Sequence, residues 1–175
     1  CVRNNSTTHL LDRVAKDMGQ QCYEVPVGFK YISAKMAQTN AVIGGESSGG
    51  LAVRGHIAGK DGIYAAALLV EMLAVTGKSV SQLYQEITDK YGMLYYEDAA
   101  FTMTQARKAE LQEKLFVKLE VPDFGNTVEK INRTDGCKVY FTDGSWVICR
   151  FSGTEPLLRM AAEADEQAVA DGYIK

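Results

Sequence analysis

The chain has 175 residues, of which 46% are hydrophobic and 23% charged, and its formal net charge at pH 7 is -3. This composition predicts a soluble globular protein of one or two domains. The acidic balance, without a long basic stripe, argues against a nucleic-acid partner. The longest apolar run, Ile63 to Val70, is far below the roughly 20 residues that a membrane-spanning helix needs, so we expect no membrane insertion.

The first half of the chain alternates between strand and helix patterns. Ser6, Thr7 and Thr8 form a predicted N-cap cluster, and apolar residues at helical spacing follow them. Further helices are predicted over residues 29–37, 65–74 and 79–91, and strands over residues 22–27 and 41–43. The helix over residues 65–74 is strongly apolar, which suits packing on a sheet face. This alternation predicts an α/β fold, an α/β/α layer with a parallel or mixed sheet.

The character of the sequence changes after Gly92. Residues 93–104 have mixed polarity and predict an extended crossover, and residues 105–116 predict a charged helix. Strands are predicted over residues 127–131, 138–141, 145–150 and 157–164, with an Asp-Gly hairpin signal at residues 142–144. We therefore predict two domains, an α/β domain over residues 1–95 and a small α+β domain with an antiparallel sheet over residues 105–175.

The cysteines and the two ends of the chain indicate its context. The four cysteines, Cys1, Cys22, Cys137 and Cys149, form no C-x-x-C pair, and with only two histidines they predict no metal site. Free thiols are typical of a reducing compartment, so we expect a cytoplasmic protein. The start lacks an initiator methionine and a signal segment, and the last residues have the pattern of a helix that has barely begun. We therefore expect a fragment of a longer chain.

The first candidate site is the loop GGESSGG, residues 44–50, after the strand predicted over residues 41–43. Ligands of open α/β sheets bind at the carboxyl ends of strands. The glycines allow close approach of the backbone, while Glu46 accepts and Ser48 donates hydrogen bonds, a pair that suits adjacent sugar hydroxyls. The alternative is a flexible glycine turn with a solvated carboxylate.

The segment RGHIAGKDG, residues 54–62, precedes the apolar helix, and Asp61 is the predicted N-cap of that helix. Lys60 would face a phosphate or a reacting hydroxyl, or it is a solvated surface lysine. His56 belongs to the residue type that serves as a general acid or base, but a histidine in a loop is more often only a hydrogen-bonding residue.

The second candidate site is the segment CRFSGTEPLLRM, residues 149–160. Ser152 and Thr154 offer hydroxyl donors, and Gly153 lets backbone N–H groups turn inward. Arg150 and Arg159 flank the loop with guanidinium groups, which match phosphate oxygens in bidentate geometry. The lysine of a Walker loop is missing, and a plain inter-strand turn with edge charges is the alternative.

Four segments, in their order along the chain, closely resemble the α-D-phosphohexomutase family of phosphoglucomutases, phosphomannomutases and phosphoglucosamine mutases. They are VPVGFKYI at residues 25–32, GGESSGG at 44–50, HIAGKDG at 56–62 and DGSWVICRFSGTEPLLR at 143–159. Family members have four domains around one cleft. This chain resembles most of the third, sugar-binding domain followed by most of the fourth, phosphate-binding domain. The resemblance implies that the N-terminal domains of the same chain are missing from this sequence.

The resemblance also implies roles for individual residues. Glu46 and Ser48 match the pair that binds the O3 and O4 hydroxyls of the sugar. Lys60 matches the lysine of the K-D-G segment near the sugar, and Lys30 matches the lysine of a G-[FW]-K segment that faces the cleft. The residues that match the phosphate cradle are Arg150, Ser152, Gly153 and Thr154, with Arg159 as a support of the loop or a further contact.

Members of this family move phosphate between O1 and O6 of an aldohexose through a phosphoserine and an intermediate of the glucose 1,6-bisphosphate type. The family's T-A-S-H-N-P serine motif and its D-x-D-x-D-R loop, which binds Mg²⁺ in the second domain, are absent from this sequence. The resemblance therefore implies that this chain has no catalytic residue of its own. It would supply recognition of a phosphosugar to an intramolecular phosphotransferase.

Two hypotheses about the parent protein stay open. The chain is part of a mutase and inactive alone, or it is a standalone phosphosugar-binding module without catalysis. We expect a phosphoglucomutase or phosphomannomutase parent, with a phosphoglucosamine mutase as the alternative. Gly50 stands where many phosphomannomutases and phosphoglucosamine mutases have a histidine, which favours a phosphoglucomutase. Ser47 replaces the glutamate or methionine that is frequent in the sugar loop and leaves the substrate class open.

Overall fold

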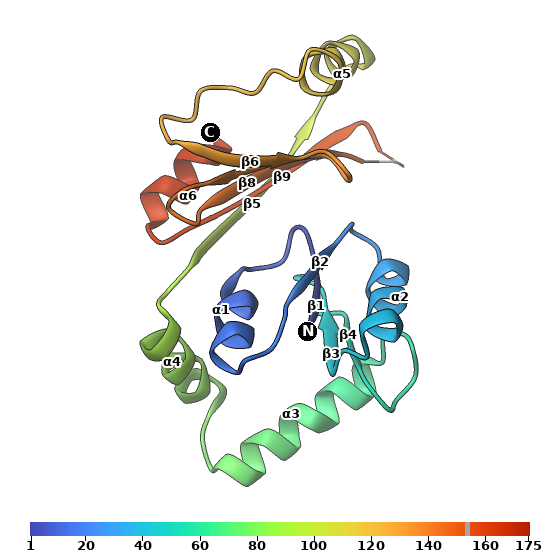
Figure 1. The fold of residues 1–175 in the computed structure, drawn as a ribbon, viewed down its shortest axis with the longest axis vertical. Coiled ribbons are helices and arrows are strands. Elements are labelled where there is room, and N and C mark those ends of the chain that lie inside the picture. Colours follow the sequence, from blue (N-terminus) through green and yellow to red (C-terminus); the bar gives the residue numbers. More distant parts are fainter. Residues whose placement is uncertain (153–154) are drawn as a thin grey trace. The chain divides into compact units, whose positions relative to one another are not determined.

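The computed structural model describes residues 1–152 and 155–175, and these residues form two compact units, Cys1–Met93 and Leu94–Lys175 (Figure 1). The first unit contains a mixed sheet between helices, and the second contains an antiparallel sheet with helices on one face. The predicted fold class, an α/β/α layer followed by a small α+β domain, is confirmed.

Sheet A of the first unit has four short strands. They are β1 (Val2–Asn4), β2 (Tyr23–Val25), β3 (Ile43–Gly45) and β4 (Leu51–Val53). Their order is β2-β1-β3-β4, with β1 parallel to both of its neighbours and β4 antiparallel to β3. The sequence pattern did not indicate β1 or β4, because three residues are too few for a recognisable period of two.

The first unit has four helices: α1 (Leu10–Asp17), α2 (Phe29–Thr39), α3 (Gly62–Thr76) and α4 (Val80–Tyr91). Helices α1 and α2 lie on opposite faces of sheet A (Figure 1). The apolar core lies between the sheet and α2 and consists of Val2, Val25, Ile32, Met36, Ala41 and Ala52.

The opposite face of β1 is held by two ion pairs of one arginine. Neighbouring strand residues point to opposite faces, so Arg3 lies on the face of α1 while Val2 packs on α2. The Arg3 Nε donates to the Asp12 carboxylate of α1 at 2.6 Å, and Nη1 donates to Glu24 of β2 at 2.7 Å. Burial disfavours the charged guanidinium, but these two carboxylates outweigh it and raise the pKa of Arg3. These ion pairs therefore tie α1 and β2 to the central strand.

Helix α3 contradicts one expectation of the sequence. Its start is as predicted, because the Asp61 carboxylate accepts a hydrogen bond from the backbone N–H of Tyr64 at 3.0 Å. However, none of its described residues is buried, and Ile63 and Val75 are 86% and 80% exposed. The helix contacts the edge strand β4 instead of covering the sheet face. The prediction of packing on a sheet face from apolar composition alone was therefore wrong.

Sheet B of the second unit has five antiparallel strands in the order β5-β9-β8-β7-β6. They are β5 (Tyr95–Thr102), β6 (Val128–Asn132), β7 (Cys137–Phe141), β8 (Trp146–Phe151) and β9 (Leu157–Ala164). The predicted Asp-Gly hairpin joins β7 to β8, where Gly144 donates to the carbonyl of Phe141 at 3.0 Å. The expected extended crossover is in fact β5, which pairs along its whole length with β9.

One face of sheet B is covered by helices. Helix α5 (Gln105–Gln112) continues as a π-helical turn, η1 (Glu113–Val117), and α6 (Gln167–Ile174) follows β9. The buried core between them and the sheet consists of Leu115, Cys137, Val139, Phe141, Val147, Ala162 and Tyr173. Residues of β7 and β8 at the alternate positions point to the other face of the sheet.

Within the described residues no single helix is long and apolar enough to cross a membrane. Only α3 and α4 taken together reach such a length and composition, as a pair bent by 80°.

Gly136 and Gly144 provide a matched test of packing beside β7. Both have positive φ, 83° and 89°, but a Cβ on Gly136 would clash with the backbone of Cys149, whereas one on Gly144 meets nothing within 4 Å. We expect Gly144→Ala to cost about 1 kcal/mol of unfolding free energy through backbone strain, and Gly136→Ala at least about 3 kcal/mol. Chemical denaturation of both variants measures this, and equal losses would contradict the described packing.

Candidate functional site

The candidate sugar site, residues 44–50, comprises the end of β3 and a tight connection to β4 over residues 46–50, which is called the sugar loop below. The backbone N–H of Glu46 donates to the carbonyl of Gly50, and that of Gly49 donates to the carbonyl of Glu46, both at 2.9 Å. The backbone N–H of Ser47 donates to the Thr7 hydroxyl at 2.9 Å. These three bonds hold the loop in the described conformation.

The Glu46 carboxylate is the best-supported group of this loop. Its side chain is only 6% exposed, and Oε2 accepts a hydrogen bond from Lys60 Nζ at 3.2 Å. Oε1 accepts from the Asn4 side-chain amide, also at 3.2 Å. The structure thus brings two of the predicted residues, Glu46 and Lys60, together at one carboxylate, while Ser48 lies exposed on the same turn.

Asn4 is a residue of this site that sequence analysis missed. It is the last residue of β1, and its Oδ1 accepts from the Ser6 backbone N–H at 3.0 Å and from the Thr7 hydroxyl at 2.8 Å. Ser6 and Thr7, predicted as N-caps of α1, are therefore engaged with Asn4. The N-cap position of α1 is His9, which makes no side-chain capping bond, but the hydroxyl of Thr8, the third residue of the predicted cluster, accepts from the backbone N–H of Leu10 at 3.1 Å. Asn4 and Thr7 together fix the sugar loop from the neighbouring strand.

Gly50 leaves space that Lys60 fills. A Cβ on Gly50 would lie 2.7 Å from the Cδ of Lys60 and 3.3 Å from the Glu46 carboxylate. The ammonium of Lys60 also lies 5.4 Å from the centre of the Phe29 ring, a cation–π arrangement. A larger residue at position 50 would displace the lysine from the carboxylate. The size of the residue at position 50 therefore determines whether the Lys60 ammonium can reach the Glu46 carboxylate.

In their described contacts, neither Lys30 nor His56 reaches the Glu46 carboxylate. Lys30 is exposed in the first turn of α2, with its ammonium 4.9 Å from the Tyr31 ring centre. His56 Nε2 lies 2.8 Å from Asp61 Oδ2, and its ring stacks on Tyr64. The backbone N–H of Tyr64, and then His56, hold the pKa of Asp61 below its usual range. The described contacts of His56 are therefore with residues at the start of α3.

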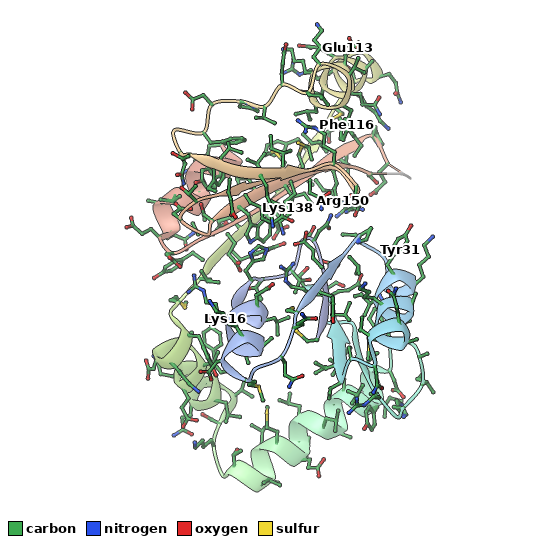
Figure 2. All side chains as sticks on the ribbon, viewed as in Figure 1. Lys16, Tyr31, Glu113, Phe116, Lys138 and Arg150 are labelled. Carbon is green, nitrogen blue, oxygen red and sulfur yellow. The ribbon has the colours of Figure 1, made fainter. Side chains whose placement is uncertain are left out.

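The loop that we expect to bind phosphate, residues 152–156, follows β8 and is called the phosphate loop below. Arg150 of β8 and Arg159 of β9 are directly opposite each other in the antiparallel register, so both point to the same face of sheet B. Like charges at such positions repel each other. Figure 2 shows Arg150 on the face of sheet B opposite to Phe116. The structure thus places two guanidinium groups at the two ends of one loop.

Each of these arginines contacts one carboxylate. Arg150 Nε donates to Asp135 Oδ1 at 3.1 Å, and Arg159 Nη2 donates to Glu155 Oε2 at 3.2 Å. The Arg150 side chain is 25% exposed and that of Arg159 55%, so Arg150 has the better-defined position. Asp135, in the turn before β7, is a supporting residue that no sequence signal indicated, because it lies far from the loop along the chain.

Two hydrogen bonds that involve Ser152 close the loop between the arginines. Ser152 donates its backbone N–H to the Leu157 carbonyl at 2.8 Å, and its hydroxyl accepts from the backbone N–H of Glu155 at 3.2 Å. Gly153 and Thr154, both predicted to bind phosphate, lie outside the described residues. Among the described residues, no group of three His, Cys, Asp or Glu side chains could hold a metal ion. These residues therefore do not fit the coordination of the magnesium that the family resemblance implies.

Comparison with known proteins identifies the family to which both units belong. Residues 1–91 match the family described as phosphoglucomutase/phosphomannomutase, alpha/beta/alpha domain III, and residues 100–174 match the phosphoglucomutase/phosphomannomutase C-terminal domain. The chain is 32% identical over 174 residues to the phosphoglucomutase/phosphomannomutase of Thermococcus kodakarensis, covering 99% of this chain and 36% of that protein. It is 30% identical over 177 residues to phosphoglucomutase-1 of Bos taurus, covering 87% of this chain and 31% of that protein.

The fold is also similar to a solved structure. The open form of parafusin, a phosphoglucomutase from Paramecium, superposes with a TM-score of 0.73 at 26% identity, over 95% of this chain and 33% of that one. The chain spans about a third of the length of the relatives that it matches. Since the two family matches together cover nearly all of its residues, the chain belongs to the phosphoglucomutase/phosphomannomutase family, the α-D-phosphohexomutases.

Proposed function

We propose that this chain supplies phosphosugar recognition to a phosphohexomutase that interconverts hexose 1-phosphate and hexose 6-phosphate. The observation that supports this best is the pair of arginines, Arg150 and Arg159, opposite each other at the ends of one loop. Their repulsion would be relieved by an anion that contacts both. The family membership makes a phosphoryl group the natural anion, because relatives are named as phosphoglucomutases.

In this proposal the second unit binds phosphate. Guanidinium groups pair with phosphate oxygens through parallel N–H donors, and Ser152 and Thr154 would add hydroxyl donors. Gly153 would let backbone N–H groups approach the same oxygens. Asp135 positions Arg150 through its Nε, which leaves the other end of the guanidinium to face a ligand. Each hydrogen bond to a charged group contributes about 1.5–3 kcal/mol.

The first unit would bind the hydroxyls of the sugar. A carboxylate accepts O–H donors at both of its oxygens, so Glu46 suits two adjacent hydroxyls, with Ser48 as a further partner. Lys60 and Asn4 hold the carboxylate in place before any ligand arrives. Lys30 would be a further cation near the ligand. Binding through the O3 and O4 hydroxyls is possible in either of two flipped orientations of a hexose, which a reaction between O1 and O6 requires.

Recognition of this kind would contribute to the reaction without touching the transferred group. Holding the phosphate that does not react uses remote binding energy to position the reacting hydroxyl. The intermediate of the glucose 1,6-bisphosphate type carries a phosphate at each end, so one of them would always be available to the phosphate loop. The phosphoserine and Mg²⁺ of the reaction would come from segments outside these residues. We therefore propose that this chain is inactive alone, and its cytoplasmic location stays a prediction.

We further propose glucose phosphate as the preferred substrate. Support comes from Gly50, because the side chain of Lys60 occupies the volume that a larger residue would take. A histidine at that position would place a different donor beside the Glu46 carboxylate. Mannose and glucosamine phosphates are the alternatives that a substrate comparison would reveal.

Titration of the chain with glucose 1-phosphate, followed by amide chemical shifts, tests the proposal. We expect shifts at Gly49, Ser152 and Thr154 with a dissociation constant in the millimolar range or tighter, since a few charge-assisted bonds offset the loss of ligand freedom. Inorganic phosphate alone should shift Ser152 and Thr154 but leave Gly49 unchanged. A folded sample without any of these shifts would argue against recognition by this chain.

Replacing Arg150 should weaken binding selectively. For Arg150→Ala we expect at least a roughly tenfold higher dissociation constant for glucose 1-phosphate, because a phosphate loses a charged partner. In a mutase that contains these residues, the same change should lower kcat/KM by well over tenfold. Arg107→Ala is the matched control, since it removes the same charge from the exposed face of α5. Equal effects of the two variants would remove Arg150 from the phosphate site.

Glu46→Gln separates sugar recognition from phosphate recognition. The amide keeps the shape of the side chain but loses a charged acceptor, so we expect affinity for glucose 1-phosphate to fall about tenfold. Affinity for inorganic phosphate should not change, because the phosphate loop is in the other unit. The two dissociation constants can be measured by calorimetry. A parallel loss for both ligands would mean that the variant disturbs folding or that Glu46 does not contact the sugar.

A further inference from the structure

The two cysteines of the second unit lie opposite each other on neighbouring strands. Cys137 of β7 and Cys149 of β8 are directly paired in the antiparallel register. Both belong to the face of sheet B that the helices cover. The Cα atoms of directly opposed residues in such a pair lie about 4.5–5.5 Å apart, and disulfides form across about 4.4–6.8 Å. The backbone therefore already has the spacing that a disulfide requires.

The two thiols also interact with each other. Neither cysteine is in a disulfide, and the two thiols are close enough for each to shift the pKa of the other. The neighbouring Cys149 thiol, with help from the charge of Arg133, lowers the pKa of the Cys137 thiol, while the Cys137 thiol and burial raise the pKa of Cys149. Of the two, Cys137 is therefore the thiol that loses its proton more readily. A thiolate beside a thiol is the arrangement from which a disulfide forms by attack of one sulfur on the other.

A cavity gives small molecules a route to this pair. Both cysteines line a cavity of about 460 Å³ between sheet B and the helical segments, with Leu115 and Met160 among its apolar walls. Cys137 itself is only 3% exposed on the outer surface. However, the lining also includes Asp123 and Gly172, which are exposed residues. The cavity therefore connects the dithiol to solvent, and its volume admits a molecule as small as hydrogen peroxide.

We propose that Cys137 and Cys149 form a redox site at which hydrogen peroxide converts the two thiols into an intrachain, cross-strand disulfide. The Cys137 sulfur attacks one peroxide oxygen, the O–O bond breaks, and the departing hydroxide takes up the thiol proton as water. The resulting sulfenic acid is attacked by the Cys149 sulfur, which forms the S–S bond and releases a second water. Two thiols and one peroxide thus give one disulfide and two waters, with the two sulfurs oxidised and the peroxide reduced.

The site would be selective within the chain. Cys22, in the first unit, has a thiol whose pKa burial raises to about 11, so little of it is thiolate at neutral pH. Cys137 and Cys149 lie in the second unit, where Cys149 directly precedes Arg150 near the start of the phosphate loop. The proposal concerns thiol chemistry alone, and it holds or fails independently of the proposed phosphosugar binding.

The unaltered chain, treated with equimolar hydrogen peroxide and mapped by proteolysis and mass spectrometry, tests this. We expect a monomer that has lost two thiols, with a linked pair of peptides that contains Cys137 and Cys149. Dithiothreitol should restore both thiols. Cys22 should be modified at least about tenfold more slowly, because the reactive species is the thiolate. No residue of the second unit is changed, so a failure of folding cannot explain a negative result.

The variant Cys149→Ser is the matched control. It keeps a hydroxyl donor near Cys137 but lacks the second sulfur, so oxidation should stop at a sulfenic acid that dimedone traps. A linked pair between two chains, a bond to Cys1 or Cys22, or oxidation of Cys137 to a sulfinic acid in the unaltered chain would each overturn the proposal. Persistence of both thiols in the folded, unaltered chain would overturn it as well.

Discussion

Two guanidinium groups of the second unit lie opposite each other on neighbouring strands, where like charges repel. Arg150 and Arg159 stand at the two ends of one loop, and each is paired with one carboxylate. Those carboxylates, Asp135 and Glu155, come from different parts of the chain, and each of them pairs with one of the two arginines. A doubly charged anion that contacts both arginines would offset their repulsion. The fold therefore holds two like charges close together at the ends of this loop, an arrangement that would favour the binding of an anion.

In the first unit, the candidate ligand-binding group is a negatively charged carboxylate, which is also paired with neighbouring side chains. Glu46 has a largely buried carboxylate, and the fold supports it with an amide from Asn4 and an ammonium from Lys60. A buried carboxylate without such partners would be costly. Since both partners approach from within the same unit, the acceptor has a defined position before a ligand arrives. Preorganisation of this kind reduces the entropy that binding would otherwise lose.

Because successive residues of a strand point to opposite faces of the sheet, β8 contributes to two different candidate sites. Cys149 and Arg150 are neighbours in sequence, yet they point to opposite faces of sheet B. One face is covered by η1 and α6 and encloses the thiols. The other face presents Arg150, which Figure 2 labels, and Arg159, its partner in the register. Gly136 lies beside both, because any side chain there would meet the Cys149 carbonyl and the Arg150 side chain. The close approach of β7 to β8 thus constrains both sites.

The sequence by itself determined the features that depend on local signals. The loops at residues 44–50 and 149–160, the Asp61 cap and the Asp-Gly hairpin were all evident, because their residue types act within a few positions of the chain. The roles of the loop residues stay predictions. Only the tertiary structure decided that Asn4 and Asp135 support the two loops, that Cys137 faces Cys149, and that α3 lies exposed. These facts depend on strand pairing and packing between distant segments, which a period or a motif does not encode.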